Sequence, residues 1–197
     1  NFKDFGISIN CTFAYGNTFE QLQNVKAGEV NAVVSSTGRI PAAYLKRKAG
    51  IPYVEGLPCG TYMRKRIQEC IREVIETGEN RIAFDLNEGN GEILVIGEEI
   101  YAHSMVTEIN HSLPGNKARA LFPDVDEGID EDSLLDAVSK ARIVIADPLF
   151  QNCIDSSTTQ LIPVPHLGYS GRMFIQNTPV YTAKEFHIES LFKGVNL

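Results

Sequence analysis

The sequence predicts an α/β protein of two successive Rossmann-like parallel-sheet units, each a three-layer αβα arrangement, joined by a long helix. Two observations carry this prediction. Short, nearly continuous apolar segments alternate with helical patterns, as is typical of parallel sheets covered by helices. A polar, glycine-rich stretch at residues 81–91 follows the longest amphipathic helix and indicates a boundary. We therefore expect one unit in residues 1–78, including the linking helix, and a second in residues 79–197, including a C-terminal tail.

The first unit shows a β-α-β-α-β order. Its expected strands are residues 7–13, 30–34 and 51–55. Thr18 and Gln21 have the spacing of a capping box, which indicates a short helix after the first strand. Pro41 suits the first turn of the next helix, and Gly50 is expected to end that helix.

The linking helix is expected over residues 61–77, with Gly78 at its end. Its apolar side chains share one face, while Arg64 and Arg72 lie mainly on the other. The elements expected in the second unit are strands at 92–97, 118–121, 142–146 and 160–164, and helices at 101–113 and 133–140.

Composition excludes several classes of protein. The 197 residues carry a formal net charge of −7, which does not suit a nucleic-acid partner. No apolar run reaches the roughly 20 residues that span a bilayer, so no membrane association is expected. The four cysteines lack CxxC spacing, which argues against a metal site and suits a reducing, cytoplasmic compartment.

The candidate site lies in the loops after the strands. Because the carboxyl ends of parallel strands meet at one edge of a sheet, and open α/β sheets bind ligands there, these loops are expected to line a cleft between the units. The candidate cofactor-binding residues are Ser35, Ser36, Cys59, Asp147, His166, Tyr169 and Arg172. The pattern assigns no catalytic residue.

Cys59 directly precedes a helix, where the helix dipole lowers the pKa of a thiol. This position predicts the most reactive of the four thiols, with a redox or ligating role. A small residue in a tight strand-to-helix turn is the alternative, and we favour it because a lone cysteine is weak evidence.

His166 lies on a glycine-rich loop after an apolar strand. Its imidazole could bind a metal or transfer a proton near neutral pH, or it could simply form a hydrogen bond to a loop carbonyl. Gly168 and Gly171 would let the loop approach a ligand closely. Arg172 offers a planar fork for a carboxylate or phosphate. Gly97 is followed by two glutamates and lacks the remaining glycines of a dinucleotide fingerprint, which argues against NAD.

Several segments resemble the nitrogenase component 1 type oxidoreductases. This family includes nitrogenase subunits, their cofactor-assembly scaffolds and the dark-operative tetrapyrrole reductases. The similarity rests on residues 6–9, 30–34, 42–45 and the Gly-Ile-Pro-Tyr turn at 50–60, and on Asp147-Pro148-Leu149-Phe150. The chain is similar to the family's second domain, in part, followed by its third, so we expect a C-terminal fragment that is inactive alone.

The resemblance implies a subunit that accepts electrons from an ATP-dependent iron–sulfur reductase and reduces a substrate bound between domains. It also implies a second component 1-type subunit, identical or different, and an iron–sulfur cluster in the parent protein, with none on this fragment. The family's nitrogenase cluster ligands are not reproduced: Ser35 and Ser36 stand where a cysteine is expected, and His166 precedes Tyr169 by three residues, one fewer than in those subunits. The resemblance therefore favours a tetrapyrrole or another large cofactor over dinitrogen. A non-catalytic scaffold for metallocluster or tetrapyrrole assembly is the alternative.

Overall fold

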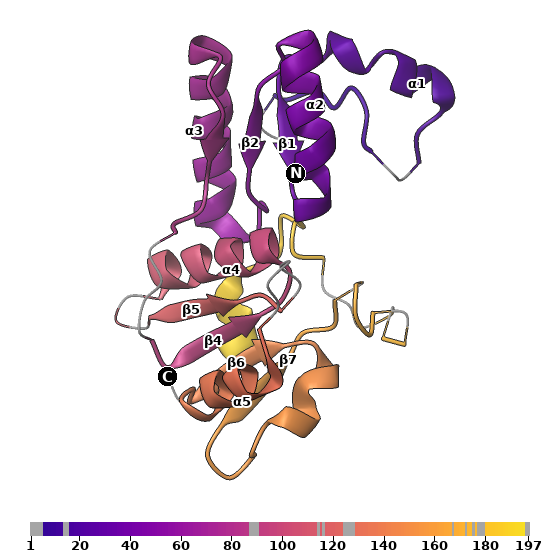
Figure 1. The fold of residues 1–197 in the computed structure, drawn as a ribbon. Coiled ribbons are helices and arrows are strands. Elements are labelled where there is room, and N and C mark those ends of the chain that lie inside the picture. Colours follow the sequence, from indigo (N-terminus) through magenta and orange to yellow (C-terminus); the bar gives the residue numbers. More distant parts are fainter. Residues whose placement is uncertain are drawn as a thin grey trace.

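The chain forms two separate parallel sheets, which lie one above the other in Figure 1. The computed structural model describes residues 6–13, 16–86, 91–113, 115, 117–123, 129–166, 168–171, 173, 174, 176 and 180–195. All strand pairs in both sheets are parallel. The expected α/β class, with two parallel sheets and interleaved helices, is confirmed.

The first sheet has three strands in the order β1 (Asn31–Val33), β2 (Tyr53–Glu55), β3 (Arg81–Ile82). Its helices are α1 (Phe19–Gln23), α2 (Arg39–Ala49) and α3 (Gly60–Thr77), with 3-10 turns η2 (Val25–Ala27) and η3 (Ser36–Gly38). The capping box of Thr18 and Gln21 is present at α1, and Gly50 and Gly78 end α2 and α3 in the left-handed conformation. The sequence predicts these features correctly because each is decided within one turn of helix.

The second sheet has four strands in the order β5-β4-β6-β7. They are β4 (Ile93–Ile96), β5 (Ala118–Leu121), β6 (Ile143–Ala146) and β7 (Gln160–Pro163). The remaining elements are α4 (Glu99–Ser112), α5 (Glu131–Ser139), η4 (Pro148–Cys153) and η5 (Ile188–Phe192).

Alternate residues of β4 pack on opposite faces of this sheet. Ile93 and Val95 join the core cluster that contains α4, whereas Leu94 and Ile96 join a cluster with Val138 of α5. The second sheet therefore carries α4 on one face and α5 on the other, as expected where strands are apolar on both sides.

Two expectations about the order of the elements are wrong. Residues 7–13 form no strand. Helix α3 does not join the units, because it runs from β2 to β3, two neighbouring strands of the first sheet. Strand β3 carries the first sheet past residue 78, and the division into domains at residues 78 and 79 stays a prediction.

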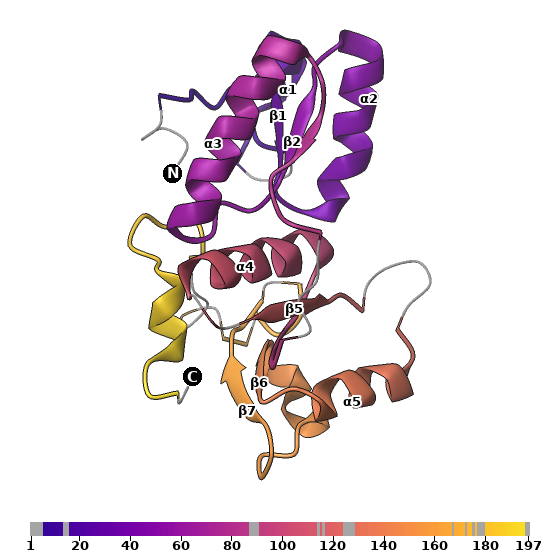
Figure 2. The same ribbon diagram turned by 90° about the vertical axis from the view of Figure 1, so that its left-hand side faces the viewer.

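Helix α4 is the element through which the two units pack. It lies between the first unit and β5 in both ribbon views (Figures 1 and 2). Residues 100–109 are all buried, which is unusual for a helix of a small domain and indicates packing on every side. A single core cluster accordingly runs from Val33 and Val54 of the first sheet, through Ile100 and Met105 of α4, to the second sheet.

The C-terminal segment returns to the first unit. Arg64 was expected on the polar face of α3 but is buried, and its guanidinium donates to the backbone oxygens of Ala183 (2.9 Å) and Phe186 (3.5 Å). Ile188 and Phe192 are buried against the core that includes α4. An arginine can lie inside because its donors reach backbone carbonyls.

Candidate functional site

Polar side chains of α4 accept hydrogen bonds from backbone amides at the carboxyl edge of the first sheet. Ser104 Oγ accepts a hydrogen bond from Leu57 N at 2.9 Å, and Thr107 Oγ1 accepts one from Asp85 N at 2.9 Å. Both acceptors are buried. They replace the water that would otherwise satisfy these loop amides.

Glu98 likewise accepts a backbone hydrogen bond from the loop that carries Ser35 and Ser36. Its Oε1 accepts a hydrogen bond from Ser36 N at 2.6 Å, and its Oε2 accepts one from Tyr101 N at 3.0 Å, which caps α4. The Ser35 and Thr37 hydroxyls lie 3.2 Å apart. The backbone amide of Ser36 is therefore hydrogen-bonded to a carboxylate of the second unit.

Glu108 caps the N-terminus of α3 from the side. Its Oε1 accepts hydrogen bonds from Thr61 N (2.9 Å) and Tyr62 N (3.2 Å), and its Oε2 accepts one from Met63 N (2.7 Å). The carboxylate is buried and lies where an anion would bind at a helix N-terminus. Glu98 and Glu108 thus satisfy, from within the chain, the amide donors to which an anionic ligand of the first sheet would bind.

An ion-pair network connects the two units beside these contacts. Arg39 of α2 bonds Glu55 at the end of β2 (2.9 Å) and Glu99 at the start of α4 (3.0 Å). The hydrogen bonds from Arg39 lower the pKa of the Glu99 carboxyl, although partial burial opposes them. Arg39 therefore carries a charge-assisted link between the first sheet and α4.

At the second sheet, Asp147 holds the loop that follows β7. Its Oδ2 accepts hydrogen bonds from His166 N (2.9 Å) and Ser170 N (3.2 Å), and its Oδ1 accepts one from Leu149 N (3.0 Å). Burial acts to raise the pKa of this carboxyl, but the hydrogen bonds outweigh it and the pKa is lowered. Asp147, expected among the ligand-binding residues, uses these bonds to fix the loop that carries His166.

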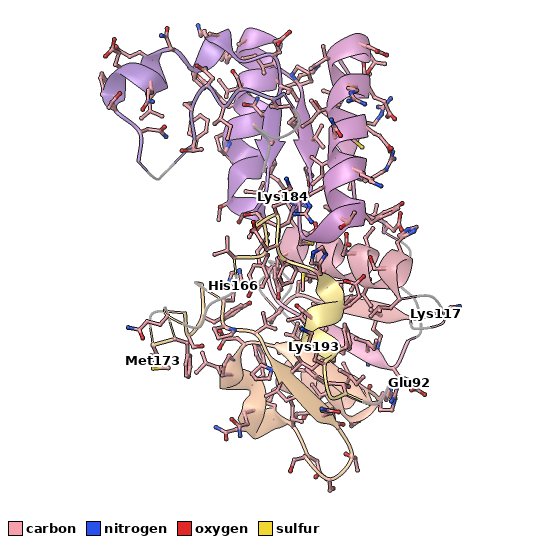
Figure 3. All side chains as sticks on the ribbon, turned by 180° about the vertical axis from the view of Figure 1, so that it is seen from behind. Glu92, Lys117, His166, Met173, Lys184 and Lys193 are labelled. Carbon is pink, nitrogen blue, oxygen red and sulfur yellow. The ribbon has the colours of Figure 1, made fainter. Side chains whose placement is uncertain are left out.

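His166 is half-buried and surrounded by aromatic rings. Its ring centroid lies 5.3 Å from that of Tyr101 and 5.5 Å from that of Tyr169. Nδ1 accepts a hydrogen bond from Gly168 N at 3.0 Å, so the neutral ring carries its proton on Nε2. Figure 3 shows His166 at the level where the two units meet.

Tyr101 supports this arrangement from inside. It is buried, its ring packs edge-on against Tyr181 at 5.3 Å, and burial raises its pKa far above the usual range for tyrosine. Tyr181 donates its hydroxyl proton to Pro165 O at 2.9 Å, next to His166. The phenols are therefore neutral donors that pack against the loop.

At Cys59, burial and the helix dipole act on the thiol pKa in opposite directions. Cys59 is the N-cap residue of α3, as expected, but it is fully buried in the core. Burial raises its pKa, and the nearby charge of Glu108 raises it further. A reactive thiol does not fit this burial, because desolvation of a thiolate acts against the helix dipole, whereas the favoured alternative of a small residue in a tight strand-to-helix turn does fit it.

The structure brings together only some of the expected site residues. Asp147, His166 and Tyr169 share one loop cluster at the second sheet, and Arg172 lies outside the described residues. Sequence reasoning missed Tyr101, Glu98 and Glu108. A signal was present in α4, where carboxylates and hydroxyls occur among apolar residues on every side of the helix, so that any polar group there must be buried and paired.

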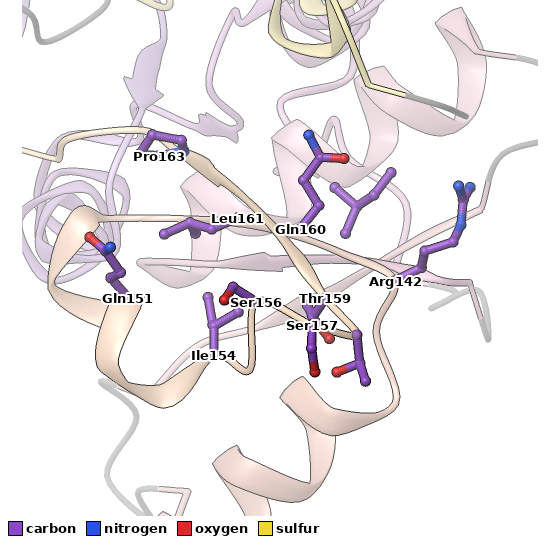
Figure 4. A pocket seen from close by; sticks show the side chains of 11 residues that line it. Arg142, Gln151, Ile154, Ser156, Ser157, Thr159, Gln160, Leu161 and Pro163 are labelled. Atoms are coloured by element: carbon purple, nitrogen blue, oxygen red, sulfur yellow. The ribbon is translucent and has the colours of Figure 1, made fainter.

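A pocket of about 660 Å³ lies elsewhere, along the free edge of β7 (Figure 4). Its lining includes Arg142, Gln151 and the hydroxyl-rich turn before β7. The backbone N–H groups of Gln160 and Val164 donate to the strand side of β6. The nitrogen of Pro163, one residue out of step, faces away from β6, and because proline has no N–H this outer edge of β7 has one donor fewer. The pocket shares no lining residue with the His166 loop.

The part of the chain that the structure describes holds no group of three or more His, Cys, Asp or Glu side chains placed to bind a metal ion. Cys59 and Cys70 are buried in the core, which does not fit ligation of a cluster. Among the described residues, no helix is long and apolar enough to cross a membrane.

Comparison of the sequence with known proteins identifies a family. The sequence profile described as "Nitrogenase component 1 type Oxidoreductase" matches residues 1–92, which span the first sheet. The chain is 33% identical over 73 residues to a subunit of the light-independent protochlorophyllide reductase of Polytrichum commune, over 36% of this chain and 70% of that protein. No solved structure matches. The chain therefore belongs to the nitrogenase component 1 type oxidoreductase family.

Proposed function

We propose that this chain is part of a component 1-type subunit that accepts electrons from an ATP-dependent iron–sulfur reductase and reduces a substrate bound between domains. Family membership is the observation that carries the proposal. The similar protein from Polytrichum commune is named as a reductase subunit, which supports a multi-subunit enzyme. The companion in this proposal is a second component 1-type subunit. Such an enzyme would act in the cytoplasm.

We place the substrate at the edge of the second sheet. The first sheet's amide donors are engaged by Glu98, Ser104 and Glu108, whereas the loop after β7 carries His166 between two aromatic rings. Aromatic faces and a ring N–H suit a flat, conjugated ligand with an oxygen or carboxylate acceptor. The substrate class we propose is a tetrapyrrole, in keeping with the protochlorophyllide named for the relative.

The side chains around the site have distinct tasks in this proposal. Asp147 holds the loop through backbone amides, Tyr101 and Tyr169 limit the orientation of the imidazole, and the Gly168 amide selects the tautomer. His166 would then orient the substrate through its imidazole. An iron–sulfur cluster, typical of the family, does not fit the described residues of this chain, so residues outside them would have to supply its ligands.

A non-catalytic scaffold that binds a tetrapyrrole or metallocluster during assembly is the second candidate. One observation favours it: the carboxylate of Asp147 accepts hydrogen bonds from three backbone amides, that of His166 among them, and is a poor proton donor because its pKa is lowered. A scaffold would use the loop that carries His166 to bind its ligand and would need no electron-transfer partner.

Reconstitution separates the two functions. The protein would be co-expressed with its companion subunit, combined with the ATP-dependent reductase, and supplied with protochlorophyllide. We expect a change in the pigment's absorption spectrum that requires both ATP and the reductase. Stoichiometric binding without reduction would favour the scaffold, and neither binding nor reduction would contradict both.

A further inference from the structure

Helix α2 presents an apolar and basic stripe that no described part of the chain covers. Its exposed residues are Ile40, Ala43, Tyr44, Arg47 and Lys48, at the i, i+3, i+4, i+7 and i+8 spacing of one helix face. Ile40 is 82% exposed and Tyr44 is 52% exposed. The guanidinium of Arg47 lies 5.7 Å from the centre of the Tyr44 ring, so a cation is held beside the apolar side chains.

Charge is distributed very unevenly between the two units. Residues 1–82 hold eleven Lys and Arg against eight Asp and Glu, whereas residues 83–197 hold seven against seventeen. Helix α2 itself contains four basic residues and no acidic one. A partner for its stripe is therefore expected to combine acidic and apolar side chains.

Helix α5 of the second unit has this composition. Glu131, Asp132, Leu135 and Asp136 are exposed, and Leu135 is 41% exposed. Lys140 pairs with Asp136 at the end of the helix, so the acidic character is strongest toward its start. The α5 surface is thus the chemical complement of the α2 stripe.

We propose that the α2 stripe of one copy of this chain docks on α5 of a second copy. The two helices lie at opposite ends of the molecule in Figures 1 and 2, so the pairing is between chains, head to tail. Because each copy keeps one free α2 and one free α5, assembly continues beyond the dimer. This proposal goes beyond the proposed function and does not depend on it.

The contact is weak and governed by charge. One helix pair buries less than the roughly 1,200 Å² of stable interfaces, so a dissociation constant on the order of 100 μM is expected. Exposed charges are screened within about 10 Å at 0.1 M salt. Association therefore weakens at least several-fold between about 20 mM and about 500 mM salt.

Sedimentation velocity over a range of protein concentrations tests the proposal with two variants. Arg47→Glu reverses a charge of the α2 stripe, and Asp132→Arg reverses an exposed charge near the start of α5. Each variant alone is expected to stay monomeric, whereas an equimolar mixture associates, because the intact α2 of one variant meets the intact α5 of the other and the two reversed charges attract each other. Arg72→Glu changes another exposed cation of the first unit and should associate like the wild type.

Three results would overturn the proposal. The wild type could remain monomeric at low salt, the mixture of variants could remain monomeric, or Asp132→Arg alone could associate like the wild type. The last result would indicate that α2 pairs with another α2. Circular dichroism checks that both exposed substitutions leave the fold intact.

Discussion

Replacing Glu108 tests the packing of the two units most sharply. Its carboxylate accepts hydrogen bonds from three amides at the start of α3 and a fourth from Ser112 Oγ at 2.9 Å. Thr61 is exposed and Tyr62 half-buried, so their amides can turn to water, but Met63 is buried. The cost of losing the carboxylate therefore depends on the Met63 amide and on the helix N-terminus.

The magnitude follows from these contacts. An unsatisfied buried amide costs about 1–3 kcal/mol. Loss of an N-cap costs about 1 kcal/mol, and loss of a partly buried anion at a helix N-terminus costs up to about 2 kcal/mol. Because these contributions overlap, we expect Glu108→Ala to lower the free energy of unfolding by about 3 kcal/mol. Glu108→Gln keeps one acceptor oxygen and should lose about 2 kcal/mol.

Urea unfolding followed by circular dichroism measures both changes. Glu76→Gln is the matched control, since Glu76 is an exposed glutamate of α3, and it should change stability by less than about 0.5 kcal/mol. Gly60 supplies a second check: a Cβ there would lie 2.3 Å from Glu108 Cδ, so Gly60→Ala should cost less when combined with Glu108→Ala than alone. A loss below about 0.5 kcal/mol for Glu108→Gln would refute the capping role.

Three further outcomes are expected. Because folding lowers the pKa of Asp147, its ionised carboxylate stabilises the fold above the unfolded pKa of about 4, and this stabilisation is lost as the pH falls below that value. Asp147→Asn should therefore be less stable at pH 7, and its free energy of unfolding should fall less steeply with acid than that of the wild type; an equally steep fall would contradict this. Maleimide labelling of the native protein should modify Cys11 and Cys153 before Cys59, with mass spectrometry as the readout, and early labelling of Cys59 would show that its site opens readily. Arg39→Lys keeps the charge but loses the forked hydrogen bonds, and should lower the free energy of unfolding by about 1 kcal/mol in urea; no change would mean that the network is dispensable.

Local signals in the sequence predicted the fold well. The capping box at Thr18 and the glycines at the ends of α2 and α3 act within a few residues, and the apolar strands 93–96 and 143–146 are buried on both faces. Strand pairing is not local. Strand β3 has two residues, too few for a period to be recognised, so the sequence favours α3 as a link between units, whereas it is a crossover within the first sheet.

The sequence predicts only part of the candidate site, because the contacts that define the rest join residues far apart in the chain. Their position in loops after strands identifies Asp147 and His166. The sequence does not show whether such a polar side chain binds a ligand or forms hydrogen bonds with the backbone of the chain. Asp147 meets backbone amides, and Cys59 lies in the core in spite of its helix N-terminus. Glu98 and Glu108 are separated from their amide partners in the first unit by more than forty residues, a separation at which only the folded chain reveals the contact.

The central claim is that ligands bind at the second sheet's edge, beside His166. Its most direct test is the titration of protochlorophyllide into the assembled protein and its His166→Ala variant, with exposed His187→Ala as the matched control. We expect His166→Ala to weaken binding about tenfold, or about 1.4 kcal/mol, with a melting temperature close to that of the wild type, and His187→Ala to bind normally. Unchanged affinity together with a clear loss of melting temperature in His166→Ala would contradict the claim.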